Sequence, residues 1–422
     1  MGCARAVIWA VGSPAAGASK NPLLLHEILF QPLLRWISGA LYAAGARSFC
    51  VVRTGAAWDE RLRACLPAAE AGDAVLLEAG SETLRQDLLA FAAGAGVTVA
   101  VTRPLLVTAH AVETMTTAHS GGGQLLTELL TDDEHRTGLY CFAGAAAGRL
   151  FAFLDDRFDF TLACLAMRER GLPLGEFFVS DGAGGAVCVT TPPELDAARR
   201  AMQRAVAARH MRRGVTIVDP DHTYIDADTV IGRDTTILPG VILRDGCTVG
   251  EDCEIGPHTL LRASEVGDGC AVISSHLHES RLGRGVRVGP FAYLRPGSVV
   301  EDGGKVGDFV EIKNARVGAG SKIPHLSYVG DADIGAGVNI GCGSITVNYD
   351  GRVKRRTVVE DGAFIGCNTN LVAPVTVGKG AYTAAGSTVT DPVPPGALAV
   401  ARTRQENRED WVARRRPPRA ET

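Results

Sequence analysis

Two hydrophobic patterns divide the chain. Over residues 1–190, short apolar runs alternate with stretches whose apolar residues follow a helical period. The stretches at 33–45 and 84–96 predict helices. Buried strands are predicted for the runs at 5–11, 48–52, 74–79 and 97–101. This alternation favours an α/β domain with a mostly parallel, Rossmann-like sheet.

A helix of different character is predicted at 192–214. It begins with Pro-Pro, ends at Gly214 and keeps one apolar face, while most of its other residues are basic or small. A helix of this kind is typical of a connection, so we expect a linker helix over 191–214. The apolar face consists of Leu195, Ala198, Met202 and Val206.

From residue 215 onward an aliphatic residue returns every six positions, often followed by Gly. This period fits neither a helix nor a hairpin meander, and it is typical of the hexapeptide repeats of a parallel β-helix. Each repeat turns one aliphatic side chain inward, and stacked coils bury a continuous aliphatic column. The positions in phase are Ile225, Ile231, Ile237, Leu243, Val249, Ile255 and Leu261, then Val288, Leu294, Val300, Val306 and Ile312, and finally Val359, Ile365, Leu371, Val377, Thr383 and Val389.

A polar, basic stretch at 347–359 interrupts the repeat, and the C-terminal tail leaves it. We therefore expect four segments along the chain. They are an α/β domain over 1–190, the linker helix over 191–214, a β-helix domain over 215–402 and a tail over 403–422.

The composition is that of an ordinary globular protein, with 422 residues, 46% hydrophobic and 21% charged. A formal net charge of -4 gives no overall attraction to nucleic acid or to an acidic membrane, so neither is expected as a partner. No apolar run approaches the roughly 18 residues that a membrane span needs. The 11 cysteines form no C-x-x-C pair, which favours reduced thiols and a cytoplasmic location.

Chemically active side chains gather within residues 290–402, among coils that are otherwise Gly, Ala and aliphatic residues. Arginine and lysine together suit a phosphate, and a histidine, whose ordinary pKa is about 6.5, can accept a proton near neutral pH. Since these residues lie about one coil apart or less, stacking would bring them onto one ridge. They are Arg295, Lys313, His325, Tyr328, Asn339, Asn348 and Tyr349.

Four stretches carry a resemblance to a known family: "VGPFAYLRPG", "VGDFVEIKNARVGAGSK", "HLSYVGDADIGAGVNIGCGSITVNYDG" and "LVAPVTVGKGAYTAAGSTVT". From about residue 215 to 411 the chain resembles the C-terminal domain of the bifunctional N-acetylglucosamine-1-phosphate uridyltransferase/glucosamine-1-phosphate N-acetyltransferase (GlmU) family. The resemblance implies a left-handed β-helix, an exception to the usual right-handed crossover. It also implies a homotrimer with active sites between subunits.

The same resemblance implies an activity and its cosubstrate. The activity is the acetyl-CoA-dependent N-acetylation of glucosamine 1-phosphate, on the route to UDP-N-acetylglucosamine and cell-wall precursors. Its substrates are small molecules, and the acetyl transfer needs no metal.

The resemblance also implies roles for individual residues. His325 matches the general base, and Lys354 matches a basic loop residue that reaches a neighbouring subunit's acetyl-CoA site. Cys342 and Cys367 stand where the family often has Ala and Ser, which are also small, so we expect cofactor binding to survive. The sugar-phosphate binders are matched by Arg295, Lys313, Tyr328 and Asn339. The acetyl-CoA contacts are matched by Cys342, Asn348, Tyr349, Cys367, Ala385 and Arg402.

The N-terminal half departs from the family's Gly-rich phosphate loop. The aligned stretch is "WAVGSPAAGASKNPLLLH". The second Gly of the family is replaced by Pro14, the Thr by Ala15, the basic residue by Ala16 and the later Lys by Leu23. Lys20 is a partial substitute at a different spacing. Without glycine backbone and basic side chains, the nucleotide phosphates lose their cradle.

The magnesium ligands of the family are missing as well. In "VTRPLLV", Thr102 takes the place of an Asp that supplies a carboxylate to Mg²⁺, and Arg103 lies beside it. The family's Asn ligand near the linker helix is replaced within "LDAARRAM". We therefore expect a degenerate nucleotidyltransferase domain that has lost uridylyl transfer and packs inertly. Mg²⁺ is a cofactor only if this domain is active.

Three alternatives stay open. The first is a fully bifunctional enzyme that also makes UDP-N-acetylglucosamine from UTP. The second is a zinc enzyme of the hexapeptide class, for which His276 and His278 lie on one side of an extended strand; His325 is too far along the repeat to join them. The third is a non-catalytic trimeric scaffold.

Overall fold

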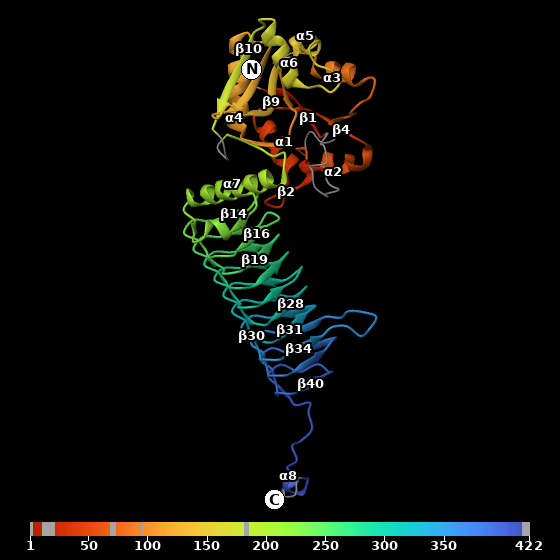
Figure 1. The fold of residues 1–422 in the computed structure, drawn as a ribbon. Helices are drawn as coiled ribbons and strands as arrows, with labels where there is room; N and C mark the ends of the chain where they lie inside the picture. Colours follow the sequence, from red (N-terminus) through yellow and green to blue (C-terminus); the bar gives the residue numbers. More distant parts are fainter. Residues whose placement is uncertain (1–2, 11–21, 68–72, 95, 181–184, 416–422) are drawn as a thin grey trace, which may run out of the picture. The chain divides into compact units, whose positions relative to one another are not determined.

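The computed structural model describes residues 3–10, 22–67, 73–94, 96–180 and 185–415. The chain divides into two compact units (Figure 1). The first comprises residues 1–212 and 220–227, and the second comprises residues 213–219 and 228–422. Within the described residues, no helix combines the length and the apolar character needed to cross a membrane.

The first unit is built on a seven-stranded sheet of order β10-β8-β9-β6-β1-β4-β5. Strand β9 runs antiparallel to its neighbours, and the other pairs are parallel. Strand β1 pairs with β4 on one side and with β6 on the other, so the strand order reverses at β1. The strands are β1 (Cys3–Trp9), β4 (Ser48–Arg53), β5 (Val75–Glu78), β6 (Val97–Val101), β8 (Leu126–Thr131), β9 (Arg136–Ala143) and β10 (Leu174–Val179).

Further helices and short strands complete the first unit. The predicted strands and helices are confirmed, apart from residues 11 and 95, which lie outside the described residues. The helices are η1 (Leu23–Leu25), α1 (Leu33–Ala43), η2 (Ala56–Trp58), α2 (Asp59–Ala64), α3 (Leu84–Ala92), α4 (Ala109–Gly122), η3 (Gly144–Ala146), α5 (Ala147–Phe151), α6 (Phe160–Glu169), α7 (Pro192–Met211) and η4 (Pro220–His222). The short strands are β2 (Glu27–Ile28), β3 (Gln31–Pro32), β7 (Leu105–Val107), β11 (Ala186–Cys188) and β13 (Tyr224–Ile225).

Helix α7 begins with a capping box, in which the Thr191 side chain accepts from the Glu194 N–H and the Glu194 carboxylate accepts from the Thr191 N–H. Its buried face is less apolar than predicted. Met202 is only partly buried, whereas Gln203 is buried and its Nε2 donates to three carbonyls, those of Pro220, Asp221 and Thr223 (2.8–3.0 Å). The carbonyls of the bend after helix α7 thus need a hydrogen-bond donor at position 203, which the glutamine amide provides.

The second unit is a left-handed parallel β-helix of hexapeptide repeats, as predicted. Three parallel sheets form its sides, and each takes every third strand along the chain. We name them S1, S2 and S3. S1 contains β12 (Thr216–Ile217), β15 (Thr236–Ile237), β18 (Glu254–Ile255), β21 (Ala271–Val272), β24 (Arg287–Val288), β27 (Lys305–Asp308), β30 (Lys322–His325), β33 (Asn339–Ile340), β36 (Phe364–Ile365), β39 (Tyr382–Thr383) and β41 (Leu398–Ala399).

The other two sides have the same construction. S2 contains β16 (Ile242–Arg244), β19 (Leu260–Arg262), β22 (His276–His278), β25 (Tyr293–Leu294), β28 (Glu311–Lys313), β31 (Tyr328–Gly330), β34 (Ile345–Val347), β37 (Asn370–Val372) and β40 (Thr388–Val389). S3 contains β14 (Val230–Ile231), β17 (Thr248–Val249), β20 (Glu265–Val266), β23 (Arg281–Leu282), β26 (Val299–Val300), β29 (Arg316–Val317), β32 (Ala332–Ile334), β35 (Thr357–Val359) and β38 (Val375–Val377).

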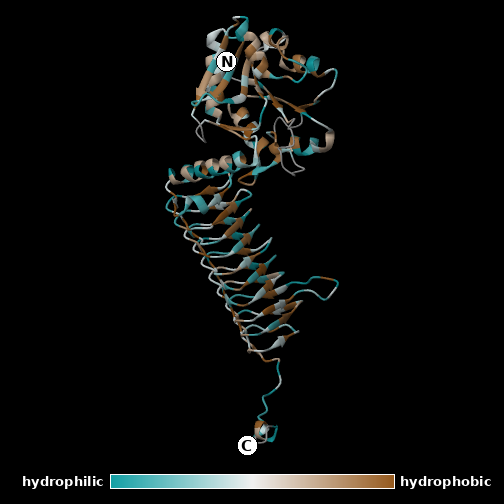
Figure 2. Cartoon of the chain, in the orientation of Figure 1, coloured by the Kyte–Doolittle hydropathy of each residue, from teal (hydrophilic) through white to brown (hydrophobic). Residues whose placement is uncertain are grey.

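The inward column predicted from the six-residue period is present, because every aliphatic residue named for it is buried, and so is Thr383. Apolar and polar residues alternate coil after coil along this unit (Figure 2). At Gly341 the next coil comes so close that an added Cβ would lie 2.5 Å from the Cys367 nitrogen. Glycine at this corner therefore sets the distance between coils.

The predicted interruption is also present. Between β34 and β35 the chain leaves the coils as a loop, which stands out from the β-helix in Figure 1. Tyr349 and Lys354 pair across it as an isolated antiparallel bridge. After the last coil the chain ends its described part in the short, exposed helix α8 (Trp411–Arg415).

Candidate active site

One corner of the β-helix, between S1 and S2, collects several predicted site residues. Two positions after the inward residue of S1, successive coils carry Asp308, His325, Cys342, Cys367 and Ala385 in matching register. We call this set the corner column. It places the predicted base directly in line with three predicted acetyl-CoA contacts.

His325 is an exposed member of the corner column, with 53% of its side chain accessible. Its Nδ1 lies 2.5 Å from Oδ1 of Asp308, the residue paired with it in the preceding coil. The hydrogen bond from His325 is the main cause that holds the pKa of the Asp308 carboxyl below its usual value. Asp308 is not among the residues predicted from the sequence.

Cys342, Cys367 and Ala385 are the small residues of the corner column, and their short side chains leave the backbone accessible to a ligand. Among the described residues, no acceptor receives a hydrogen bond from the backbone N–H of Cys342, Cys367 or Ala385. Gly341 and Gly366 precede the two cysteines, and an added Cβ at either would collide with the backbone nitrogen of the next coil. The corner thus offers a line of free donors to a ligand.

The outer face of S2 carries the predicted phosphate binders. Arg295 Nη1 donates to Glu311 Oε1 (2.7 Å), and Glu311 pairs in register with Tyr328. An added Cβ at Gly330 would lie 2.3 Å from the Tyr328 hydroxyl, so the ring of Tyr328 lies over this glycine. Lys313 is the register partner of Gly330. Arg295, Lys313 and Tyr328 therefore share one surface.

Lys354 adds a second ammonium group beside Lys313. The close approach of the Lys354 side chain is the main cause that lowers the pKa of Lys313, and the charges of Lys354 and Arg295 act in the same direction. The resemblance assigned Lys354 to a neighbouring subunit's site, whereas here it lies against Lys313 of its own chain. Three cations at one place form a surface suited to a dianion.

Asp331 organises this cationic surface and was also missed from the sequence. Its side chain is buried, its Oδ1 accepts from Asn314 Nδ2 (2.6 Å), and its Oδ2 accepts from Asn348 Nδ2. Burial alone would raise the pKa of Asp331, but these bonds and the charges of Lys313 and Lys354 hold it below the ordinary value. Asp331 thus fixes Asn348, a predicted acetyl-CoA contact.

The remaining predicted residues are Asn339, Tyr349 and Arg402, and they lie on S1, in the loop and after the last coil. Asn339 lies on S1, paired with Lys322 and Phe364. Tyr349 is exposed in the loop and donates to the Gly351 carbonyl (2.7 Å). Arg402 follows the last strand of S1 and passes close to Gly386, next to Ala385 of the corner column.

The first unit has a hollow of about 590 Å³ where its parallel strands end. Trp9, Phe158 and Phe160 form an aromatic wall, with rings 5.7–6.3 Å from Trp9. Thr102 and Arg103 also line it, and Thr102 Oγ1 donates to the Gly138 carbonyl (3.0 Å). At this position a hydroxyl that is bonded to a carbonyl, next to a cation, replaces the carboxylate that Mg²⁺ prefers, although Asp156 and Asp159 also line the hollow.

Other substitutions in this half fall partly outside the described residues. Pro14, Ala15, Ala16 and Lys20 belong to that part of the chain, so the predicted loss of the phosphate loop stays a prediction. Leu23, at the position of the family's lysine, begins η1.

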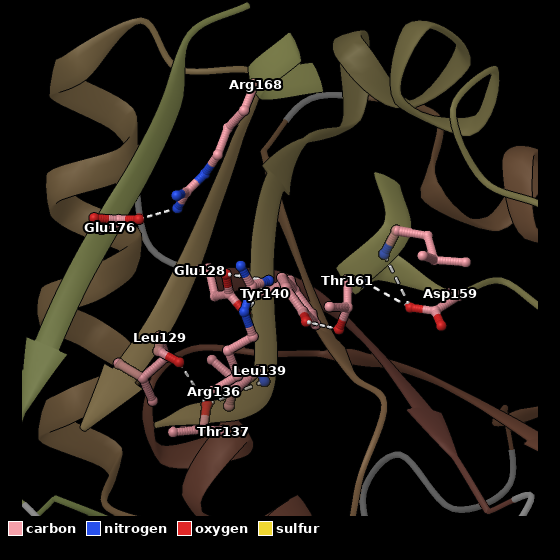
Figure 3. A network of polar contacts seen from close by, with 11 residues as sticks. Glu128, Leu129, Arg136, Thr137, Leu139, Tyr140, Asp159, Thr161, Arg168 and Glu176 are labelled. Atoms are coloured by element: carbon pink, nitrogen blue, oxygen red, sulfur yellow. Dashed lines mark hydrogen bonds and ion pairs between the residues drawn. The ribbon is translucent and has the colours of Figure 1, made fainter. Parts of the chain in front are cut away.

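A buried polar network lies behind the hollow (Figure 3). Arg136 Nη1 is 3.1 Å from Glu128 Oε2, and the Tyr140 hydroxyl is 3.3 Å from Thr161 Oγ1, which lines the hollow. Asp159 caps helix α6 by accepting from the N–H of Thr161. Burial raises the pKa of Glu128, and the charge of Arg136 opposes this. The Tyr140–Thr161 contact thus joins β9 to helix α6, whose first residues line the hollow.

The zinc alternative gains no support. His276 is exposed and faces the ring of Tyr293 edge-on, and His278 Nε2 contacts Glu279 (3.1 Å). Across the described ranges, no group of three or more His, Cys, Asp or Glu residues is arranged to hold a metal ion.

Two solved structures match parts of the chain at low sequence identity. A Francisella novicida UDP-N-acetylglucosamine acyltransferase is 15% identical, covering 44% of this chain and 67% of its own (TM-score 0.34). A CMP:2-keto-3-deoxy-manno-octonic acid synthetase complexed with CTP is also 15% identical, covering 48% and 99% (TM-score 0.36). Similarities at this level carry no argument about activity.

Sequence comparisons are decisive for the family. The model "Bacterial transferase hexapeptide (six repeats)" matches residues 228–263. "Bifunctional protein GlmU" of Geobacillus sp. (strain WCH70) is 54% identical over 52% of this chain, which spans only 48% of that relative. "Bifunctional protein GlmU" of Caldanaerobacter subterraneus subsp. tengcongensis is 37% identical over 97% of both chains. The chain therefore belongs to the bifunctional GlmU family and is a transferase with hexapeptide repeats.

Proposed function

We propose that this chain transfers the acetyl group of acetyl-CoA to the 2-amino group of glucosamine 1-phosphate. The observation that carries the proposal is the corner column. It holds a histidine with a free ring nitrogen, in line with free backbone donors and beside a cationic face. The product is N-acetylglucosamine 1-phosphate, on the route to UDP-N-acetylglucosamine and cell-wall precursors.

The S2 face positions the acceptor sugar. Arg295 and Lys313 bind its phosphate, Lys354 adds charge, and Tyr328 and Asn339 complete the sugar contacts. Fixing the phosphate places the amine in a near-attack geometry at the thioester carbon. Glu311 and Asp331 keep the cationic side chains extended toward the ligand.

Acetyl-CoA lies along the corner column in this proposal. Its thioester oxygen accepts from the free N–H groups of the corner, which stabilises the oxyanion of the tetrahedral intermediate. As the new N–C bond forms, His325 accepts the amine proton, and the C–S bond then breaks to release the CoA thiol. Proton transfer of this kind contributes roughly 10²–10⁴ in rate. The other contacts are Cys342, Asn348, Tyr349, Cys367, Ala385 and Arg402.

We assign no uridylyl transfer to the first domain, 1–190, which is joined by a linker over 191–214 to the acetyltransferase domain over 215–402. Thr102 and Arg103 support this, since neither supplies the carboxylate that the family provides to Mg²⁺ at this position. The first domain packs inertly, and another protein supplies uridylyl transfer. The name of the relatives favours a second candidate, the fully bifunctional enzyme.

The proposal includes a homotrimer in the cytoplasm. The cationic face lies on S2, whereas Asn339 lies on S1 and Arg402 follows the last strand of S1. This separation within one chain supports sites shared between subunits. Acetyl transfer needs no metal, and neither nucleic acid nor membrane takes part.

The decisive experiment is thiol release from acetyl-CoA with glucosamine 1-phosphate, run beside a pyrophosphate assay with UTP, Mg²⁺ and N-acetylglucosamine 1-phosphate. Thiol release without pyrophosphate is the expected result. Both signals would establish the bifunctional enzyme. The absence of both signals would refute the acetyltransferase and leave the non-catalytic scaffold as the remaining alternative.

A further inference from the structure

His325 and Asp308 form a histidine–carboxylate pair on the outside of the β-helix. The two residues are register partners at the ends of β30 and β27, and their side chains are 53% and 34% accessible. Within the described part of the chain, Asp308 is the only carboxylate in an ion pair with His325. The pair is therefore exposed to ligand and specific to one partner.

The residues around the Asp308 carboxylate favour its contact with the His325 imidazole. On β27, Lys305 acts on Asp308 by charge and supports its ionised form. On the other side, the neighbour of His325 in the corner column is the thiol of Cys342. Tyr328 begins the next strand, β31. Asp308 is therefore the carboxylate that contacts the ring, from the neighbouring strand of S1.

A neutral imidazole has two tautomers, and the group bonded to one nitrogen selects between them. Because the Asp308 carboxylate only accepts, Nδ1 must carry the proton, and Nε2 is left with its lone pair. We propose that Asp308 is a positioning residue that holds His325 as an Nε2 base and steadies the imidazolium that forms during acetyl transfer. This inference rests on the proposed function of the site.

Substitutions can separate this role from a structural one. Removing Asp308 leaves no unpaired buried charge, because both side chains are accessible, so the fold should tolerate Asp308→Ala. Asp308→Glu keeps a carboxylate on a longer arm and is the conservative rescue. Asp308→Asn replaces the carboxylate with an amide that can donate to Nδ1, which would place the proton on Nε2 and disable the base. Glu301→Ala, which removes an ion pair with Arg316 on S3, is the matched control.

The test is a double-mutant cycle on thiol release. We expect Asp308→Ala to lower kcat roughly 10–100-fold, the usual cost of losing a residue that orients a functional histidine, with KM for glucosamine 1-phosphate nearly unchanged. Asp308→Asn should be no better, and Asp308→Glu should recover part of the loss. In a His325→Ala background, Asp308→Ala should cost nothing more, because it acts through the ring. Additive losses, or full kcat in Asp308→Ala, would overturn the inference.

A second measurement does not depend on activity. In protein labelled with ¹⁵N-histidine, ring nitrogen shifts report the tautomer of His325, with His325→Ala identifying its signals. The wild type should show protonated Nδ1, and Asp308→Ala should show a mixture. If the wild type has protonated Nδ1 but no acetyltransferase activity, the proposed function is refuted, while the control of the His325 tautomer by Asp308 is supported. A mixture of both tautomers in an active wild type would refute the role of Asp308 and leave the proposed function standing.

Discussion

Asp331 is the residue on which most of the cationic surface depends. Asp331→Ala would leave the amides of Asn314 and Asn348 without their acceptor and Lys313 and Lys354 without a counter-charge. We expect a loss of about 1–3 kcal/mol in unfolding free energy, together with a higher KM for glucosamine 1-phosphate. Denaturant unfolding and steady-state kinetics check this. Asp333→Ala, which removes a half-exposed ion pair with Arg356, is the control and should leave KM unchanged.

The lowered pKa of Asp331 also fixes the sign of a pH effect. A carboxyl whose pKa is lower in the folded state stabilises the fold above its unfolded value of 3.8. This contribution is lost as the pH falls through the lowered pKa. The stability gap between wild type and Asp331→Ala should therefore close in acid, and a gap that persists there would contradict the assignment.

His325 gives the second prediction at this scale. His325→Ala should reduce turnover by roughly 10²–10⁴ because the proposed acceptor of the amine proton is lost, while the protein stays folded because the side chain is half exposed. Thiol release and size-exclusion chromatography measure the two outcomes. His276→Ala, on the outer face of S2, should behave as wild type, and unchanged turnover in His325→Ala would remove this residue from the mechanism.

Individual residues also show where sequence reasoning reaches its limit. The inward aliphatic residues follow from their period alone, and His325, Arg295 and Lys313 follow from their rarity among the coils. Asp308 and Asp331 do not, because each acts on a residue one coil away, and which coil positions face each other depends on shifts in the repeat. Gln203 in α7 is a similar case, since its acceptors come from the bend after the helix.

At the level of elements, the close stacking of coils makes certain glycines irreplaceable. Gly341→Ala would bring a Cβ within 2.5 Å of the Cys367 nitrogen, a backbone atom that cannot move aside. We expect a lower melting temperature and weaker acetyl-CoA binding, since the corner column would be spread apart. Thermal unfolding with and without acetyl-CoA measures both. Gly337→Ala is the control, because open space surrounds that position, although its positive φ adds a small local cost.

On the scale of the whole molecule, the two units should respond separately to pH. Burial raises the pKa of Glu128 in the first unit, so this carboxyl favours the folded state when protonated. Stability of that unit should fall as the pH rises from 4.5, its ordinary pKa, through the raised value. Glu128→Gln should remove this dependence and leave the β-helix transition in place. Scanning calorimetry across pH measures it, and an unchanged slope in Glu128→Gln would contradict the assignment.

The loop between β34 and β35 has a consequence for how such a protein can change over time. It adds residues between Cys342 and Cys367, yet both stay in the corner column, because the coil resumes its register at β35 and β36. The position of a residue in this site is thus set by the coil that carries it and not by the number of residues that precede it. Insertions that leave and rejoin the same side of the β-helix can lengthen without moving the reactive groups. Evolution can therefore vary the loop, and with it access to the ligand, independently of the chemistry.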